Sequence, residues 1–225
     1  MKFENMPKLQ SPFERELINN KYICIPKIKE EYRWVFTDES IAVEKLDGTN
    51  VSLWIRDGKP FQIMNRTNVI DFWNIKNIRF IEGVLTAIDR KYIVPELCDN
   101  GGVFGELIGK KIQGNPYKID GHLWIPFDYL IKKYKYNFWN ELVKEFKGAS
   151  DKSIFTTMSD LFTKLWSLYK RQRNIKGEVS RNIRFEMAAA EGIVFYRKGY
   201  ENKYNSCCKL RRDMFDWFTG SSHKR

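Results

Sequence analysis

Apolar residues in this chain alternate with polar ones in short runs that end at glycines and polar turns, a pattern typical of β-strands. The clearest example is 41–55 (IAVEKLDGTNVSLWI), where two β-branched runs flank Gly48. We expect a strand, a tight turn in which glycine permits positive φ, and a second strand. Asp57 and Gly58 then predict a hairpin to a strand over 61–66. Further strands are predicted over 22–25, 103–108, 123–130, 191–196 and 206–210.

Helical spacing of apolar residues marks three longer segments. Phe72, Ile75, Ile78 and Ile81 would share one face of a helix over 71–89. Helices are also predicted over 137–147 and 151–173, and a short one over 213–218. No repeat, low-complexity tract or linker divides the 225 residues, so we expect a single domain over 1–225.

Composition supports a globular protein, because 43% hydrophobic and 15% aromatic residues suffice for a sizeable core. No apolar run approaches the ~20 residues of a membrane span, and the N-terminus lacks a signal-peptide pattern. We therefore expect a cytoplasmic protein with no membrane partner. The four cysteines (Cys24, Cys98, Cys207 and Cys208) contain no Cys-x-x-Cys pair, so reduced thiols are expected rather than a zinc site.

A formal net charge of +11 favours an anionic partner such as a nucleic acid. The cations gather in clusters, which are Lys132, Lys133 and Lys135; Lys170, Arg171, Arg173 and Lys176; and Arg181 and Arg184. Aromatic residues interleave with them (Tyr134, Tyr136, Phe138, Trp139, Trp166 and Tyr169), a mixture suited to phosphates and stacked bases. Two alternatives stay open: an ordinary basic protein, and aromatics that form helix core.

Several polar residues on or beside predicted strands could together transfer a nucleotide. They are Lys45 with Asp47, Gly48 and Asn50; Arg66; Glu106; Glu191; and Lys209 with Arg211. A lysine attacks phosphorus only as the neutral amine, and its unperturbed pKa is about 10.4. The site must therefore lower that pKa by burial or by a nearby cation. Lys45, at the end of a strand, is the candidate, and an exposed turn lysine is the alternative.

The remaining requirements have candidates too. Lys209 and Arg211 alternate on one face of a strand and could hold charge at the α-phosphate. Glu106 could bind ribose hydroxyls, but a buried glutamate needs a partner, and an outward-facing strand residue is the alternative. Glu191 could bind Mg²⁺ or Mn²⁺ together with phosphate oxygens. An aromatic face for the base could come from Phe127 or, alternatively, Trp124.

In this order the motifs resemble those of the covalent nucleotidyltransferases, a superfamily that includes RNA ligases, DNA ligases and mRNA-capping enzymes. The similar segments are EKLDGTN, NRT at 65–67, FGELIGKKIQGNPY, WIPFDYL, EGIVFYR and CCKLRR, which cover roughly residues 40–215. DNA ligases and capping enzymes usually carry arginine five residues after the lysine. Asn50 holds that position here, as in RNA ligase 2-type and small phage-like RNA ligases.

The resemblance implies an α+β fold, an ATP-grasp-like ligase core of antiparallel sheets flanked by helices, with the nucleotide between the sheets. It implies that Lys45 becomes a lysyl-adenylate and that the backbone at Glu44 meets the adenine edge. The other implied contacts are Asn50 and Arg66 to nucleotide or RNA end, Glu106 to ribose, Phe127 to adenine, Lys209 and Arg211 to the α-phosphate, and Glu191 to a divalent metal.

The resemblance therefore predicts an ATP-dependent RNA ligase that joins RNA 5′-phosphate and 3′-hydroxyl ends. The alternatives are a capping guanylyltransferase, a DNA-end ligase and an inactive nucleic-acid-binding module. There are two departures from the family: the fifth motif carries Arg211 in place of its second lysine, and no separate C-terminal domain is expected. RNA binding would then depend on the core, on a basic helical insert around 130–185, or on a helper protein. We expect a monomer.

Overall fold

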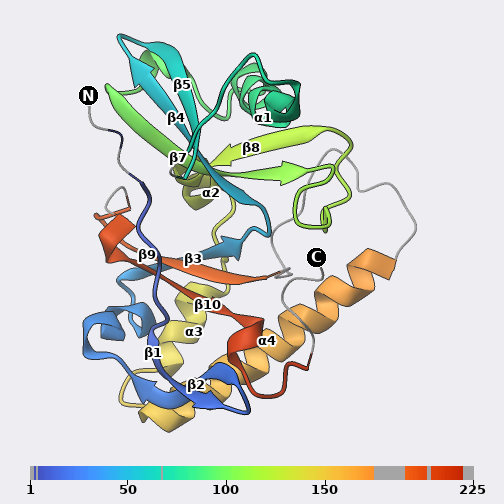
Figure 1. The fold of residues 1–225 in the computed structure, drawn as a ribbon. Helices are drawn as coiled ribbons and strands as arrows, with labels where there is room; N and C mark the ends of the chain where they lie inside the picture. The colour runs from blue at the N-terminus through green and yellow to red at the C-terminus, as the bar shows by residue number, and fades with distance from the viewer. Residues whose placement is uncertain (1–2, 4, 67, 175–190, 202–203, 220–225) are drawn as a thin grey trace.

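Two facing antiparallel sheets form the centre of the structure, a computed structural model that describes residues 3, 5–66, 68–174, 191–201 and 204–219 (Figure 1). The larger sheet has the strand order β6-β5-β4-β7-β8. Its strands are β4 (Thr49–Arg56), β5 (Lys59–Asn65), β6 (Asn68–Val69), β7 (Gly101–Gly109) and β8 (His122–Pro126). Helix α1 (Ile78–Asp89) covers its outer face, as its predicted apolar stripe requires.

The smaller sheet has the order β10-β9-β3, with β3 (Ser40–Lys45), β9 (Gly192–Arg197) and β10 (Cys207–Arg211). Helices α3 (Trp139–Glu145) and α4 (Asp151–Asn174) lie on its outer side, next to the hairpin of β1 (Phe13–Ile18) and β2 (Lys21–Ile28) (Figure 1). Helix α2 (Phe127–Lys133) follows β8 directly. The predicted α+β fold, with antiparallel sheets flanked by helices, is confirmed.

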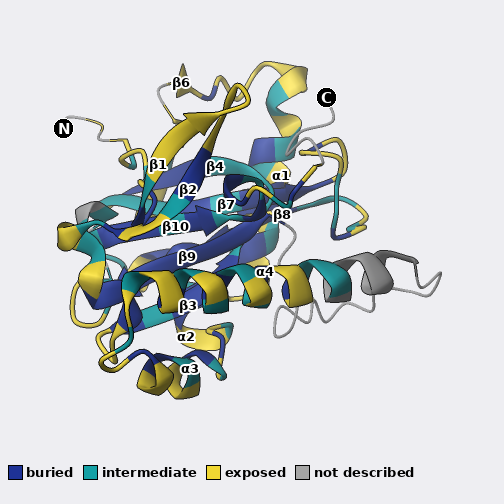
Figure 2. Ribbon diagram, turned by 90° about the horizontal axis from the view of Figure 1, so that it is seen from below, coloured by how far each residue is buried: buried dark blue, intermediate teal, exposed yellow. Residues whose placement is uncertain are grey.

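Alternation along the strands sends side chains into three hydrophobic clusters, one beyond each sheet and one between the sheets. On β3, Ala42 packs in the cluster that includes α4, whereas Val43 packs between the sheets. Cys207 and Cys208 divide in the same way, and all four cysteines are free thiols, as expected. Figure 2 shows the result: the strands of the smaller sheet are buried and the outward face of α4 is exposed.

The turn after Lys45 does not close a hairpin, although two strands joined by a short turn commonly form one. Strands β3 and β4 belong to different sheets, so Leu46, Asp47 and Gly48 carry the chain from one sheet to the other. The positive φ expected at Gly48 is not found, and the glycine is required for a different reason. A Cβ there would lie 2.4 Å from the Leu107 carbonyl oxygen of β7, which is a backbone clash.

The hairpin predicted at Asp57 and Gly58 is confirmed, with φ angles of 51° and 70°. The strand predicted over 123–130 is too long, because β8 ends at Pro126 and α2 begins at Phe127. Proline cannot donate to a strand ladder, and its φ of −58° suits the start of a helix.

Helix α1 begins later than its apolar pattern predicts. The Asp71 and Asn74 side chains accept the backbone N–H groups of Trp73 and Lys76, and such turns compete with a helix. A 3₁₀ turn (Ile75–Asn77) precedes α1, and another (Arg212–Met214) replaces the helix predicted over 213–218. The sequence also gave no sign of β1, which is mostly exposed.

Two of the aromatics among the cationic clusters, Tyr136 and Trp139, are buried in the hydrophobic core. For these two residues the alternative of a core role, rather than stacking on bases, is confirmed. Lys132 and Lys133 are exposed at the end of α2. Lys176, Arg181 and Arg184 lie outside the described residues, as do the side chains of the cluster that begins at Lys170. In the part of the chain described, no helix has the length and apolar character needed to cross a membrane.

Candidate active site

Strand register places Lys45 and Arg211 on either side of Gly192, the first residue of the central strand β9. Two residues further along, Lys209 of β10 is paired with Val194. Residues in one row of a sheet point to the same face, and Val194 packs between the sheets. Lys45, Lys209 and Arg211 therefore lie on the face that looks toward the larger sheet.

Gly192 allows this close approach because it has no side chain. A Cβ at this position would lie 2.2 Å from the Leu210 carbonyl oxygen and 2.8 Å from the Arg211 Cα. Any other residue would push β10 away from β9. The sequence contains this glycine in EGIVFYR, but its spacing alone does not reveal the clash.

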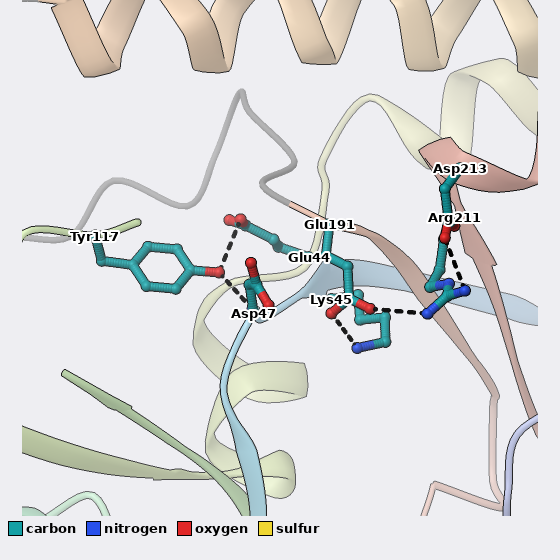
Figure 3. Close-up of polar contacts among 7 residues, drawn as sticks. All are labelled: Glu44, Lys45, Asp47, Tyr117, Glu191, Arg211 and Asp213. Atoms are coloured by element: carbon teal, nitrogen blue, oxygen red, sulfur yellow. Dashed lines mark hydrogen bonds and ion pairs between the residues drawn. The ribbon is translucent and has the colours of Figure 1, made fainter. Parts of the chain in front are cut away.

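The Glu191 carboxylate joins the two neighbouring strands (Figure 3). Its Oε2 accepts a hydrogen bond from the Lys45 ammonium, and its Oε1 lies 3.5 Å from Arg211 Nη1. The Glu191 side chain is only 6% exposed, so these charges interact where water screens them poorly. The opposite side of the guanidinium binds Asp213, with 2.9 Å between Arg211 Nη2 and Asp213 Oδ2.

The larger sheet presents Asn50 and Glu106 to the same space, because these residues are paired across β4 and β7. Glu106 shares its row with Ile125, which packs between the sheets. Arg66 follows the end of β5 directly, is exposed, and has a positive φ of 50°. The structure thus brings Lys45, Asn50, Glu106, Glu191 and Arg211 to the facing surfaces of the two sheets.

Electrostatics connects these surfaces. The pKa of Glu106 is raised to about 7, mainly by burial; Lys45 and Arg66 oppose this shift, and Glu191 and Asp47 add to it. The pKa of Lys209 is lowered to about 8, mainly by burial; Lys45, Arg211 and Arg66 act in the same direction, and Glu191 opposes them. Glu106 was expected to need a partner. Within the described residues its carboxylate has no hydrogen bond or ion pair, and the raised pKa is the consequence.

Tyr117, which sequence reasoning did not single out, fixes the turn that follows Lys45. Its hydroxyl accepts a hydrogen bond from the Asp47 backbone N–H at 2.9 Å and lies 3.4 Å from the Glu44 carboxylate (Figure 3). Glu44 is buried, with 4% exposure. Tyr117 is the last residue of the segment FGELIGKKIQGNPY, and this position was the one indication in the sequence that it belongs to the site.

The N-terminal segment contacts both sheets near these residues. Gln10 accepts the Lys209 backbone N–H at 2.8 Å, and Met6 Sδ lies 3.3 Å from Asn50 Nδ2. Further toward the N-terminus, the Phe3 ring meets Trp54 of β4 edge-on at 4.9 Å. This segment therefore runs from β10 to β4 across the edge of the site.

Of the two candidates for stacking on a base, Trp124 has no exposed surface, and its indole N–H donates to the Val51 carbonyl within the core. Phe127 is buried as well, at 7% exposure, but it packs between the sheets, with its ring 6.1 Å from that of Tyr204. Phe127 is therefore the better placed of the two.

The carboxylates of the site could bind a divalent metal only together with a bound nucleotide. Among the residues described, no group of three or more His, Cys, Asp or Glu side chains could hold an ion. Mg²⁺ and Mn²⁺ favour oxygen ligands, and Mg²⁺ commonly binds one or two carboxylates and completes its shell with phosphate oxygens and water. Glu191 could supply one such oxygen beside a bound nucleotide.

Facing antiparallel sheets, with a lysine, further cations and carboxylates between them, define the nucleotidyltransferase class. Within that class, the chain belongs to the RNA ligase family: the family model described as RNA ligase matches residues 38–211. This confirms the family resemblance of the motifs. Comparison with curated protein sequences gives no match.

Solved structures of an RNA ligase from Naegleria gruberi align with this chain. A mutant in the apo form aligns over 94% of this chain and 59% of that one, with a TM-score of 0.45 and 14% identity. A mutant with ATP and Mn aligns over 94% and 62%, with a TM-score of 0.45 and 15% identity. The structure with PPi aligns over 78% of this chain and 50% of that one, with a TM-score of 0.43 and 16% identity. The chain thus spans about half to three fifths of the length of these ligases.

Proposed function

We propose that this member of the RNA ligase family seals RNA 5′-phosphate and 3′-hydroxyl ends at the expense of ATP, through a covalent AMP on Lys45. The observation that carries the proposal is the ion-paired row of Lys45, Glu191 and Arg211, which faces Asn50 and Glu106 across the two sheets. An amine, a cation beside it and polar groups opposite are what adenylyl transfer requires.

The chemistry balances in three steps. The neutral Lys45 amine forms a P–N bond to the α-phosphorus of ATP, the bond to pyrophosphate breaks, and a proton leaves. A 5′-phosphate oxygen of RNA then attacks that phosphorus, the P–N bond breaks, and the departing nitrogen takes up a proton, which restores the lysine amine. Finally the 3′-hydroxyl attacks the activated 5′-phosphate, AMP departs, and a proton is released.

Each neighbour has a role in this scheme. Lys209 and Arg211 hold the α-phosphate and the charge that develops on it. Glu106 accepts ribose hydroxyls, Phe127 stacks on adenine, the Glu44 backbone meets the adenine edge, and Asn50 and Arg66 bind nucleotide or RNA end. A divalent cation, when bound with ATP, neutralises phosphate charge, and Glu191 would be its protein ligand.

The ion pair with Glu191 sets a condition on the first step. A protonated amine cannot attack, so Lys45 must lose its proton and this pairing before it reacts. Lys209 is the competing amine, because its pKa is lowered to about 8. Lys45 is favoured over Lys209 because the residues around Lys45 resemble the nucleophile motif of the ligases.

Incubation with α-labelled ATP or GTP and Mg²⁺ in the absence of RNA, followed by denaturing electrophoresis and peptide mapping, tests the proposal. We expect label from ATP alone, on Lys45, and none after Lys45→Ala. Sealing of a pre-adenylylated RNA should survive Lys45→Ala in part, because that step needs no lysyl-AMP.

Other outcomes identify the competing hypotheses. Label from GTP but not ATP would indicate a capping-type guanylyltransferase, and label on Lys209 would move the nucleophile to β10. A folded protein that accepts no label would be a binding module. Sealing of DNA ends in preference to RNA ends would indicate a DNA-end ligase.

A further inference from the structure

Asp213 lies beside the candidate site but belongs to none of the motifs that resemble the ligase family. It follows β10 in a single 3₁₀ turn (Arg212–Met214), two residues after Arg211. Its carboxylate is largely buried, with 17% of the side chain exposed, and it binds the guanidinium through Oδ2 at 2.9 Å. A charged group kept this far from water is costly unless it acts on a partner.

The Arg211 guanidinium is held between two carboxylates on different sides. One amino group faces Asp213 at 2.9 Å and the other faces Glu191 at 3.5 Å (Figure 3). Arginine can span two such partners because its donors form a rigid planar fork, whereas lysine carries a compact point charge. The position where the family has lysine thus carries arginine in this chain together with a second acid.

The contact with Asp213 leaves hydrogen-bonding capacity unused. Arg211 Nε and Asp213 Oδ1 are both buried, and within the described residues neither has a hydrogen-bond partner. Asp213 therefore holds Arg211 by one oxygen and one amino group rather than by the parallel pair of bonds that would occupy Nε. The Nε–H of the guanidinium thus keeps an unused hydrogen bond inside the protein.

We propose that Asp213 is a positioning residue, which holds Arg211 in the orientation that serves the α-phosphate and so makes arginine functional at this position. This inference rests on the proposed function. Arg211 and Asp213 form a matched pair: the arginine needs the aspartate to hold its orientation, whereas a lysine at position 211 would act without it.

The test is a double-mutant cycle of Asp213→Asn and Arg211→Lys, with Asp213→Glu as the charge-retaining variant. Asparagine has nearly the same shape as aspartate, so the fold should survive, and thermal melting checks this. We expect Asp213→Asn to lower the rate of self-adenylylation at saturating ATP about 10- to 100-fold, as for loss of one charge-assisted hydrogen bond. In the Arg211→Lys background the same change should cost less than about threefold.

A merely structural role gives a different pattern. Asp213→Asn would then lower the melting temperature and reduce activity equally in both backgrounds, and that result would overturn the proposal. Recovery of much of the rate by Asp213→Glu would support it, and no recovery together with equal losses would overturn it. ATP affinity, measured on the same four proteins, separates this inference from the proposed function. If the parent protein forms no AMP adduct, the proposed function is wrong. Whether the effects of the Asp213 and Arg211 changes on ATP affinity depend on each other would then still show whether Asp213 positions Arg211.

Discussion

At the scale of single residues, Glu106 makes stability depend on pH. Its pKa is about 7 in the folded protein, against 4.5 for an ordinary glutamate, so the folded state binds more protons between these values. Stability must therefore fall as the pH rises from about 4.5 to 7. Glu106→Gln removes this penalty. We expect the variant to gain on the order of 2 kcal/mol relative to the parent between pH 5 and pH 8 in denaturant unfolding.

Glu96→Gln is the control for this prediction, because Glu96 is exposed and lies in the 3₁₀ turn (Pro95–Leu97) that precedes β7. It should unfold like the parent at both pH values. An equal stability difference between the Glu106 variant and the parent at pH 5 and pH 8 would show that burial does not perturb this carboxyl.

The residues found from the sequence and those missed differ in how they act. Lys45, Glu191 and Arg211 stand out because their charges interrupt or end apolar strands. Tyr117 contacts Asp47 from 70 residues away, a distance that no local pattern spans. Asp213 is only two residues from Arg211, but its contact depends on the 3₁₀ turn that follows β10, where a helix was predicted.

At the scale of elements, the strand β9 depends on its first residue. Gly192→Ala would place a Cβ 2.2 Å from the Leu210 carbonyl oxygen, and backbone cannot yield as a flexible side chain can. We expect β10 to move away from β9, with a loss of about 1–3 kcal/mol of stability and of most self-adenylylation by the folded protein. Chemical unfolding and the labelling assay measure the two effects.

Val194→Ala is the matched control on the same face of β9. It removes volume between the sheets instead of adding it, so it should lower stability while the folded protein keeps its labelling rate. If Gly192→Ala labels as fast as this control, the spacing of β9 and β10 does not govern the site.

The presence of strands could be predicted better than their assignment to sheets. The alternation of 41–55 correctly predicted two strands, but nothing local says that β3 and β4 join different sheets. Only the partners decide this: β3 pairs with β9, and β4 pairs with β5 and β7. The start of α2 was missed for a local reason: the apolar run continues past Pro126, which ends the strand and precedes the helix.

At the scale of the whole molecule, the excess of 11 positive charges should appear in RNA binding. Each phosphate neutralised on a single strand contributes a slope of about −0.7 in log K against log salt. Reversing the exposed Lys132 and Lys133 of α2 to glutamate should therefore make the slope shallower by about 1.4 and weaken binding, if both contact phosphates. Filter binding across a salt series measures this.

The control for this prediction is Lys59→Glu, an exposed lysine on the hairpin between β4 and β5. It changes net charge without removing the α2 pair. Self-adenylylation should be unchanged in all of these variants, since ATP binds between the sheets in the proposed function. Equal losses of RNA binding and self-adenylylation would place the α2 lysines in the fold or the ATP site.

The pairing of β3 with β9 also has a consequence for the order of events during synthesis. Lys45 and its partner Glu191 are 146 residues apart, so a nascent chain holds the lysine strand for some time without β9, the strand with which it pairs. At typical translation speeds this interval lasts on the order of ten seconds. The larger sheet can form within that time, because its strands end at Pro126. Lys45 therefore acquires Glu191 and Arg211 as neighbours only after β9 and β10 have been synthesised, and adenylylation by a chain that stops before them is not expected.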